Sequence, residues 1–123
     1  MSDAIILFAH GSRDPLWRAP IEAVAALIRA QHPSRNVACA YLELCAPTLA
    51  QACHELIGKG ATQITVVPMF LGTGKHARED LPALIHALRE QHPRVQFKAQ
   101  PAIGEDLRLT TLMAEIACEG PFH

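Results

Sequence analysis

The chain alternates between short, continuous apolar runs and longer segments in which apolar residues recur every three or four positions. The apolar runs are rich in β-branched residues and cover residues 4–9, 36–42, 63–70 and 95–99. The first and third runs are continuous, as is typical of strands that are covered on both faces. The pattern therefore predicts four β-strands, of which these two are buried.

The intervening segments carry the pattern of amphipathic helices, with apolar residues at positions i, i+3, i+4 and i+7. The residues in these positions are Ile21, Val24, Ala25, Ile28; Leu49, Ala52, Cys53, Leu56; Leu81, Leu84, Ile85, Leu88; and Leu109, Leu112, Met113, Ile116. Pro47 and Pro82 suit the first turns of two of these helices, where a missing N–H costs nothing. The order βαβαβαβα predicts an α/β fold, with a four-stranded parallel sheet, helices on both faces and right-handed crossovers.

Two of the expected helix ends resemble each other. Residues 27–37 read "LIRAQHPSRNV" and residues 87–97 read "ALREQHPRVQF". Either a βαβ unit is duplicated, or the same way of ending a helix has arisen twice. His32 and His92 each precede a proline here, and they are interpreted as cations at helix C-termini.

Length and composition limit the possible partners. The 123 residues suffice for one domain, residues 1–123, and half of them are hydrophobic. A net charge of -1 creates no field that attracts nucleic acid, and no apolar run is long enough to span a bilayer. We therefore expect neither a nucleic-acid partner nor a membrane partner.

The four cysteines favour a reducing compartment. No pair has the C-x-x-C spacing of a zinc or redox site, and no N-terminal targeting segment is recognisable. Cys39 and Cys53 fall on expected core positions, and Cys45 is either a core residue or an adventitious metal ligand. The thiols are interpreted as reduced and the protein as cytoplasmic.

Candidate chemistry follows three of the expected strands. His10 comes after the first strand, Glu43 after the second and His76 after the third. In open α/β sheets, ligands bind beyond the carboxyl ends of the strands, so a sheet order of 2-1-3-4 would bring these side chains to one mouth. Imidazole binds cobalt, nickel, iron and zinc, and it also accepts protons near neutral pH.

Simpler roles exist for the same residues. Either histidine could be an ordinary loop or capping residue, and Glu43 could be a partner for the N-terminus of the helix expected at Pro47. The segment "GTGKHARED" lacks the spacing of a phosphate-binding loop, with His76 where serine or threonine should stand. No nucleotide site is therefore expected.

Three motifs together resemble a known family. "FAHGSRDP", "AYLELCAPTL" and "ITVVPMFLGTGKHAREDLP" lie between about Ile5 and Pro82, and they are similar to the short form of the CbiX family of sirohydrochlorin chelatases. The resemblance implies a flavodoxin-like half of a class II chelatase fold that works as a homodimer. It also implies an enzyme that inserts a divalent metal into sirohydrochlorin without ATP or a permanently bound cofactor, releasing two pyrrole protons. The metal would be Co²⁺, or else Fe²⁺ or Ni²⁺, and the pathway cobalamin or sirohaem biosynthesis.

The resemblance also implies roles for individual residues. His10 and His76 would bind the metal and act in catalysis with Glu43. The residues expected to contact the macrocycle are Arg13, Glu43, Leu71, Gly72, Thr73, Gly74, Lys75 and Arg78. Among these, the cations suit the peripheral carboxylates of sirohydrochlorin, and Gly11 would leave room for the flat ring. A metal or tetrapyrrole carrier without catalytic activity would use the same residues, so it stands as the alternative.

Overall fold

Four parallel strands form a single sheet in the order β2-β1-β3-β4. The computed structural model describes residues 3–120, with the backbone alone for His76. The strands are β1 (Asp3–Ala9), β2 (Asn36–Tyr41), β3 (Gln63–Pro68) and β4 (Gln96–Ala99). The predicted strand order is confirmed, and the strand ends differ from the predicted ones by no more than two residues.

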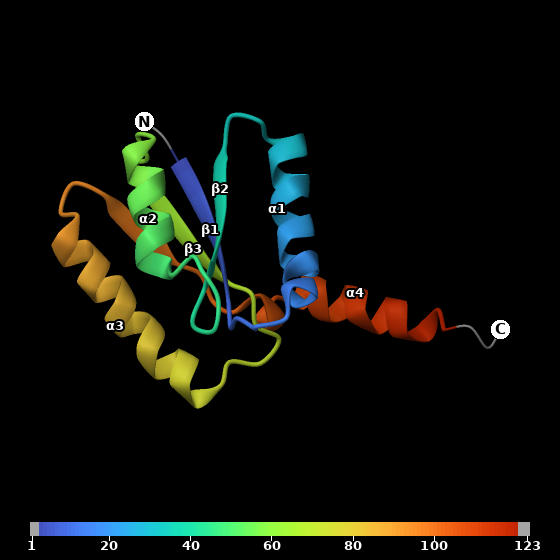
Figure 1. Cartoon of the computed structure of the whole chain (residues 1–123). Helices are drawn as coiled ribbons and strands as arrows, with labels where there is room; N and C mark the ends of the chain where they lie inside the picture. Colours follow the sequence, from blue (N-terminus) through green and yellow to red (C-terminus); the bar gives the residue numbers. More distant parts are fainter. Residues whose placement is uncertain (1–2, 121–123) are drawn as a thin grey trace.

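Helices cover both faces of the sheet, as predicted (Figure 1). The α-helices are α1 (Ala19–Gln31), α2 (Leu49–Gly58), α3 (Lys75–Gln91) and α4 (Leu107–Cys118), and the short 3₁₀ helices are η1 (Pro15–Arg18) and η2 (Ile103–Glu105). α1 lies on one face, while α2 and α3 lie on the other. Within residues 3–120, no helix is long and apolar enough to cross a membrane.

The continuous apolar runs arise because both sheet faces are buried. In β1, Ile6 and Phe8 contribute to the larger core under α2 and α3. Leu7 contributes to the smaller core under α1, together with Ala25 and Val67. Since successive strand residues point to opposite faces, every position in the middle of β1 must be apolar.

Neither proline marks the start of a helix, so those two predictions are wrong. α2 begins after Thr48, whose hydroxyl accepts the Gln51 N–H at 3.2 Å, while the Gln51 side chain accepts the Thr48 N–H at 2.8 Å. This capping box satisfies two otherwise unpaired donors and leaves Pro47 outside the helix. Pro82 lies inside α3, where it removes the bond to the carbonyl of Arg78.

The two similar helix ends have the same geometry. His32 and His92 are the C-cap residues of α1 and α3, with nearly equal backbone angles. In each unit an arginine of the helix donates from Nη2 to an edge strand: Arg29 to the Val37 carbonyl and Arg89 to the Phe97 carbonyl, both at 2.9 Å. One main-chain acceptor of each outer strand is thereby occupied.

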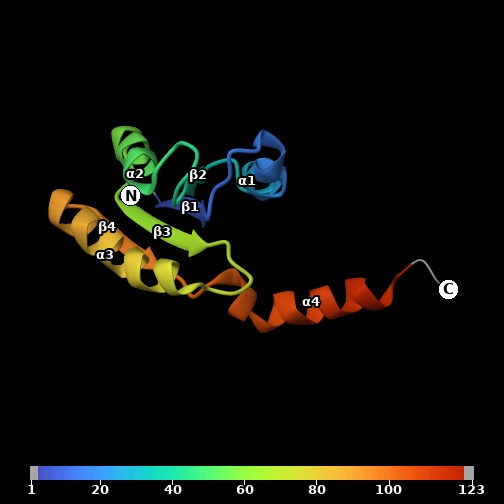
Figure 2. The same ribbon diagram turned by 60° about the horizontal axis from the view of Figure 1, so that its bottom comes forward.

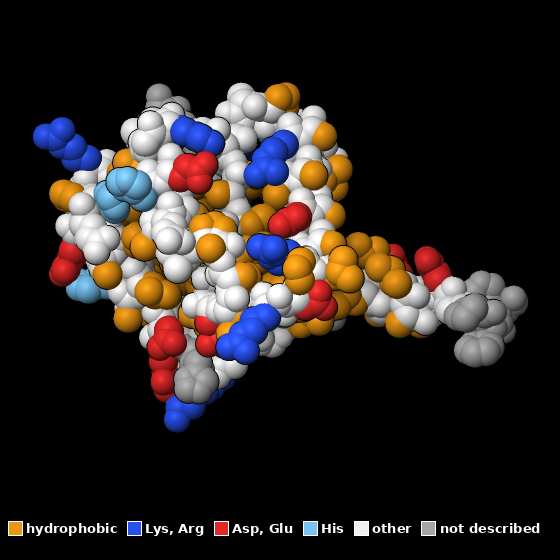
Figure 3. All heavy atoms as spheres, in the orientation of Figure 1, with side chains coloured by type: hydrophobic (Ala, Val, Ile, Leu, Met, Phe, Trp, Pro, Cys, Tyr) orange, Lys and Arg blue, Asp and Glu red, His pale blue; other side chains and the backbone are white. Residues whose placement is uncertain are grey.

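α4 points away from the rest of the chain (Figures 1 and 2). None of its residues is buried, and Leu107, Leu112 and Ile116 are each at least half exposed. Hydrophobic side chains are visible along this helix in the space-filling view (Figure 3). The predicted amphipathic helix is confirmed, and within residues 3–120 its apolar face is only partly covered.

Candidate functional site

The ends of β1 and β2 place His10 beside Glu43. Hydrogen bonding between the two strands continues past their formal ends, because the Leu42 N–H donates to the Ala9 carbonyl at 2.9 Å and the Glu43 N–H donates to the His10 carbonyl at 3.1 Å. The two residues therefore lie side by side at the mouth of the sheet, as the sequence predicts.

The side chains of this pair interact directly. His10 Nε2 lies 2.9 Å from Glu43 Oε1, and each side chain is a little over half exposed. A carboxylate only accepts hydrogen bonds, so Nε2 carries the proton and a neutral ring has its lone pair on Nδ1. Glu43 thus orients the imidazole and fixes its tautomer, which leaves a nitrogen that can bind a metal ion or accept a proton.

The alternative role of Glu43, as a partner for the start of α2, is wrong. The N-terminus of α2 is capped by Thr48 and Gln51, whereas the Glu43 carboxylate contacts His10. Of the other histidines, His54 lies within α2, and His86 pairs with Glu90 on the exposed side of α3 at 3.0 Å. The structure gives neither of them a place at the mouth.

Gly11 is required by the adjacent loop. Its φ is +106°, and a Cβ at this position would lie 1.8 Å from the carbonyl oxygen of Glu43. The expectation that Gly11 leaves room for the macrocycle stays a prediction. The structure shows a further need for glycine here: it lets the loops after β1 and β2 pass closely, which holds Glu43 next to His10.

The end of β3 provides the third side of the mouth. The Met69 N–H donates to the Phe8 carbonyl at 2.7 Å, and Phe70 packs edge-to-face on Phe8 with ring centroids 6.1 Å apart. The Gly104 N–H donates to the Phe70 carbonyl at 2.9 Å, and a Cβ on Gly104 would lie 1.9 Å from the Leu71 carbonyl oxygen. Gly104 therefore supports the segment expected to bind the macrocycle.

Gly104 was not predicted as a site residue. In the sequence it is marked only as a glycine shortly after the last strand. Without knowledge of the register between β3 and β4, this glycine could not be paired with residue 71.

The segment after β3 is partly helical. Lys75 and His76 occupy the first turn of α3, with Gly74 as N-cap, where the sequence analysis expected a loop. Lys75 and Arg78 are exposed, and Leu71 is 68% exposed. The side chain of His76 lies outside the described atoms, so its approach to His10 remains a prediction.

A cavity of about 460 Å³ lies between this segment and β4. Its lining combines apolar side chains, including Phe70 and Leu81, with Thr73 and Arg78. Thr73 and Arg78, which are both expected to bind the macrocycle, thus line a partly apolar cavity. Arg13 is an exposed cation in the loop after β1.

Metal donors at the mouth are few. Among the described side chains, which exclude that of His76, no group of three His, Cys, Asp or Glu residues could hold a metal ion. Within residues 3–120 the four cysteines form no disulfide. Burial raises the pKa of Cys39, and it raises the pKa of Cys53 to about 12, so both remain protonated thiols. Cys45, two residues after Glu43, is half-buried. Its two predicted roles, as a core residue or as an adventitious metal ligand, stay predictions.

The fold and this arrangement define a parallel α/β protein with an open histidine–carboxylate pair at adjacent strand ends. An imidazole in such a pair is chemically able to bind a metal ion or to take up a proton. Within this class, the chain belongs to the CbiX family, whose model matches residues 4–119. The resemblance seen in the sequence motifs is thereby confirmed.

Individual relatives support this placement. The chain is 33% identical over 117 residues to the sirohydrochlorin ferrochelatase of Priestia megaterium, covering 92% of this chain and 42% of that protein. It is 36% identical over 122 residues to the sirohydrochlorin cobaltochelatase of Saccharolobus islandicus strain Y.G.57.14, covering 94% and 91%.

A solved structure has the same fold. The sirohydrochlorin chelatase SirB from Bacillus subtilis subspecies spizizenii, in complex with cobalt, matches with a TM-score of 0.82 and 27% identity. The match covers 97% of this chain and 51% of that one. The chain therefore spans about half the length of SirB and of the Priestia protein.

Gly11→Ala should destabilise the protein clearly, because the new Cβ meets a main-chain oxygen and the backbone keeps a positive φ. We expect a loss of at least about 1–3 kcal/mol, the usual cost of such strained backbone, measured as a lower midpoint of thermal unfolding. Gly58→Ala is the control, since a Cβ there meets nothing within 4 Å. Equal stability of the two variants would contradict the assigned role of Gly11.

Proposed function

We propose that the chain inserts a divalent metal ion into sirohydrochlorin without ATP and releases two pyrrole protons. The observation that carries this proposal is the pairing of His10 with Glu43 at 2.9 Å, at the mouth of a CbiX-family fold. The metal ion is a substrate: Co²⁺ is favoured, with Fe²⁺ or Ni²⁺ as alternatives. The names of the relatives, which include both cobaltochelatases and a ferrochelatase, support this choice.

In this proposal, His10 performs the central step. A neutral imidazole held by Glu43 can bind the incoming ion on one face of the macrocycle, or it can accept a pyrrole proton through Nδ1. His76, in the first turn of α3, is proposed to supply the second imidazole. The charges balance, because two protons leave as one dication enters the ring.

Three exposed cations are proposed to bind the periphery of sirohydrochlorin. Arg13 follows β1, while Lys75 and Arg78 lie at the start of α3. Carboxylates at the ring edge suit these side chains, and Arg can bind them through two parallel hydrogen bonds. Leu71 offers an exposed apolar surface to the ring face.

The proposed working form is a homodimer. Residues 1–123 correspond to about half of SirB and of the Priestia protein, so a second copy would take the place of their other half. α4 also has an exposed apolar face, and at 12 residues it is short for a helix that stands alone. We propose that this face packs on the second copy. Free thiols fit the reducing cytoplasm as its location.

His10→Ala should lower kcat for cobalt insertion by about 10²-fold or more, because it removes the ligand or base. His76→Ala should have a similar effect. Glu43→Gln should cost about 10–100-fold, the usual effect of losing a group that orients a ligand. Absorbance of sirohydrochlorin mixed anaerobically with cobalt measures the rate.

His54→Ala and His86→Ala serve as controls and should remain within a small factor of the unmodified protein. Product in excess of the protein would exclude a carrier, which could bind but not turn over. Normal folding and near-normal rates for both His10→Ala and His76→Ala would refute the proposed active site.

Arg13→Ala and Lys75→Ala should raise KM for sirohydrochlorin more than they lower kcat, since a peripheral contact holds substrate and transition state alike. Loss of one hydrogen bond to a charged group should weaken the free energy of sirohydrochlorin binding by roughly 1.5–3 kcal/mol. Arg94→Ala, an exposed arginine in the turn before β4, is the matched control. A collapse of kcat at unchanged KM would place these cations in the insertion step instead.

A Leu112→Glu/Ile116→Glu double variant should convert the dimer to monomers, because it places charges on the apolar face of α4. Light scattering at micromolar concentration measures the mass. Thr111→Glu, on the polar side of the same helix, should leave the dimer intact. An unmodified protein that is monomeric and fully active would contradict the proposed assembly.

A further inference from the structure

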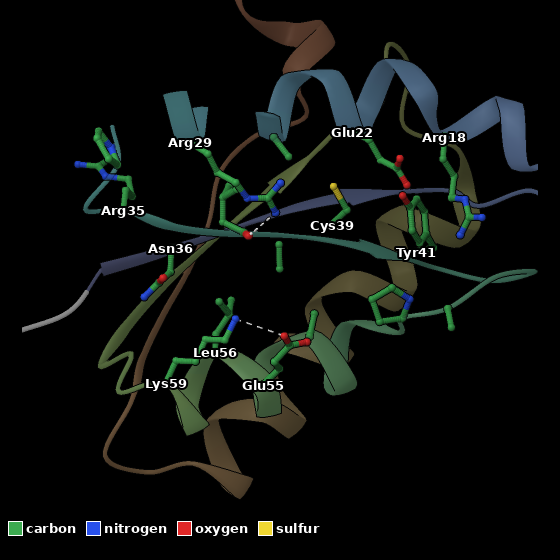
Figure 4. A pocket seen from close by; sticks show the side chains of 17 residues that line it. Arg18, Glu22, Arg29, Arg35, Asn36, Cys39, Tyr41, Glu55, Leu56 and Lys59 are labelled. Atoms are coloured by element: carbon green, nitrogen blue, oxygen red, sulfur yellow. Dashed lines mark hydrogen bonds and ion pairs between the residues drawn. The ribbon is translucent and has the colours of Figure 1, made fainter. Parts of the chain in front are cut away.

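The free edge of β2 forms the floor of a groove whose walls are α1 and α2 (Figure 4). Its volume is about 640 Å³, which falls within the range of small-molecule sites, about 300–1,000 Å³. Arg18, Glu22 and Tyr41 lie at one end, and Arg35 and Asn36 lie at the other. The groove shares no lining residue with the site at the mouth.

Cationic side chains outnumber acidic ones around this groove. The charged lining residues are Arg18, Arg29, Arg35, Lys59, Glu22 and Glu55. Glu55 is already paired with Lys59 at 3.4 Å, and the protein as a whole has a charge of -1. The excess of positive charge is therefore local to the groove, which favours an anionic occupant.

One lining residue has an unsatisfied polar group. Tyr41 is only 2% exposed, and among the described residues its hydroxyl has no hydrogen-bond partner. The Cys39 thiol is close enough for a weak contact with this hydroxyl, which acts to lower the pKa of Cys39, but the geometry does not reach that of a hydrogen bond, and sulfur is only a weak acceptor. Burial raises the pKa of Tyr41 to about 12, so the hydroxyl stays a donor at neutral pH. A buried donor without an acceptor is costly. Because the hydroxyl is covered in the free protein, a bound oxygen atom satisfies it only after a neighbouring side chain moves aside.

The floor of the groove is unsuited to an added β-strand. An exposed edge strand usually invites pairing through its free main-chain groups. Here the Arg29 guanidinium already occupies the carbonyl of Val37, the second residue of the edge strand. An extended peptide could pair with β2 only by displacing that side chain, whereas a compact ligand could use the cations where they stand.

We propose that this groove binds a small organic anion carrying carboxylate or phosphate groups, with Arg18 and the Tyr41 hydroxyl as its main contacts. Arg18 lies next to Tyr41 in the groove, and no hydrogen bond or ion pair occupies its guanidinium among the described residues. The anion is either a free small molecule or a peripheral carboxylate of a tetrapyrrole.

The chain contains its own reporter for this binding. Trp17 is the single tryptophan of the sequence, and its ring packs edge-to-face on Tyr41 with centroids 6.1 Å apart. Titration of the metal-free protein with citrate and with inorganic phosphate, at constant ionic strength, should change Trp17 fluorescence in a saturable way. The same titration with potassium chloride should not.

Variants on the two sides of Tyr41 should act in opposite directions. Arg18→Gln should weaken citrate or phosphate binding about tenfold or more, whereas Glu22→Gln should strengthen it by removing a like charge. Arg94→Gln, away from the groove, should leave binding unchanged, and so should His10→Ala. These readouts do not depend on chelatase activity.

Tyr41→Phe tests the unsatisfied hydroxyl separately. Without anion, its thermal midpoint should be equal to or above that of the unmodified protein, because a buried unpaired donor is removed. With anion, its affinity should fall about tenfold. A clearly lower midpoint without anion would show that the hydroxyl is already bonded in the free protein, and it would overturn the proposal.

The source of the anion follows from one further comparison. Calorimetry with sirohydrochlorin on Arg18→Gln should show weakened binding if a tetrapyrrole carboxylate occupies the groove, and unchanged binding if the occupant is a separate small molecule. Either result agrees with the proposal. No saturable response to citrate, phosphate or sirohydrochlorin that depends on Arg18 would refute it.

Discussion

The parallel pairing of β1 with both β2 and β3 is the constraint on which the rest of the structure depends. It sets the carboxyl ends of three strands side by side, and the hydrogen bonding continues beyond the ends of β2 and β3. The N–H groups of Leu42, Glu43 and Met69 donate to main-chain carbonyls at the end of β1 and just after it. His10 and Glu43 meet because of main-chain register. Their 2.9 Å contact is then a consequence of the sheet.

Glycines at two points allow the loops to follow this register. Gly11 lets the loop after β1 pass under the carbonyl of Glu43, and Gly104 does the same for the carbonyl of Leu71. At both points a methyl group would collide with main-chain oxygen, which cannot move without displacing the site. Flexibility is therefore not their purpose. They allow two loops to lie closer together than any side chain would permit.

The sequence predicted the sheet order and the placement of His10 and Glu43 at one mouth, because hydrophobic periodicity and the rule of strand ends depend on local pattern and topology alone. The direct contact between the two side chains was not predicted. It failed where the outcome depended on competing local signals. Pro47 suggested a helix start, but the reciprocal bonds of Thr48 and Gln51 placed the start after it. Pro82 is tolerated inside α3. Gly104 could not be found without the register of β4, and the exposure of α4 could not be read from its amphipathic pattern.

The exposure of the His10–Glu43 pair bears on its purpose. Both side chains are more than half exposed, and ion pairs in such positions contribute only about 0–1 kcal/mol to stability. The fold therefore gains little from this contact, although a glycine at positive φ and two extended strand ends are needed to form it. A backbone arrangement this specific, with little return in stability, is expected for a site that acts on a ligand. The same reasoning distinguishes it from the exposed pair of His86 and Glu90, which needs only the ordinary spacing of one helical turn.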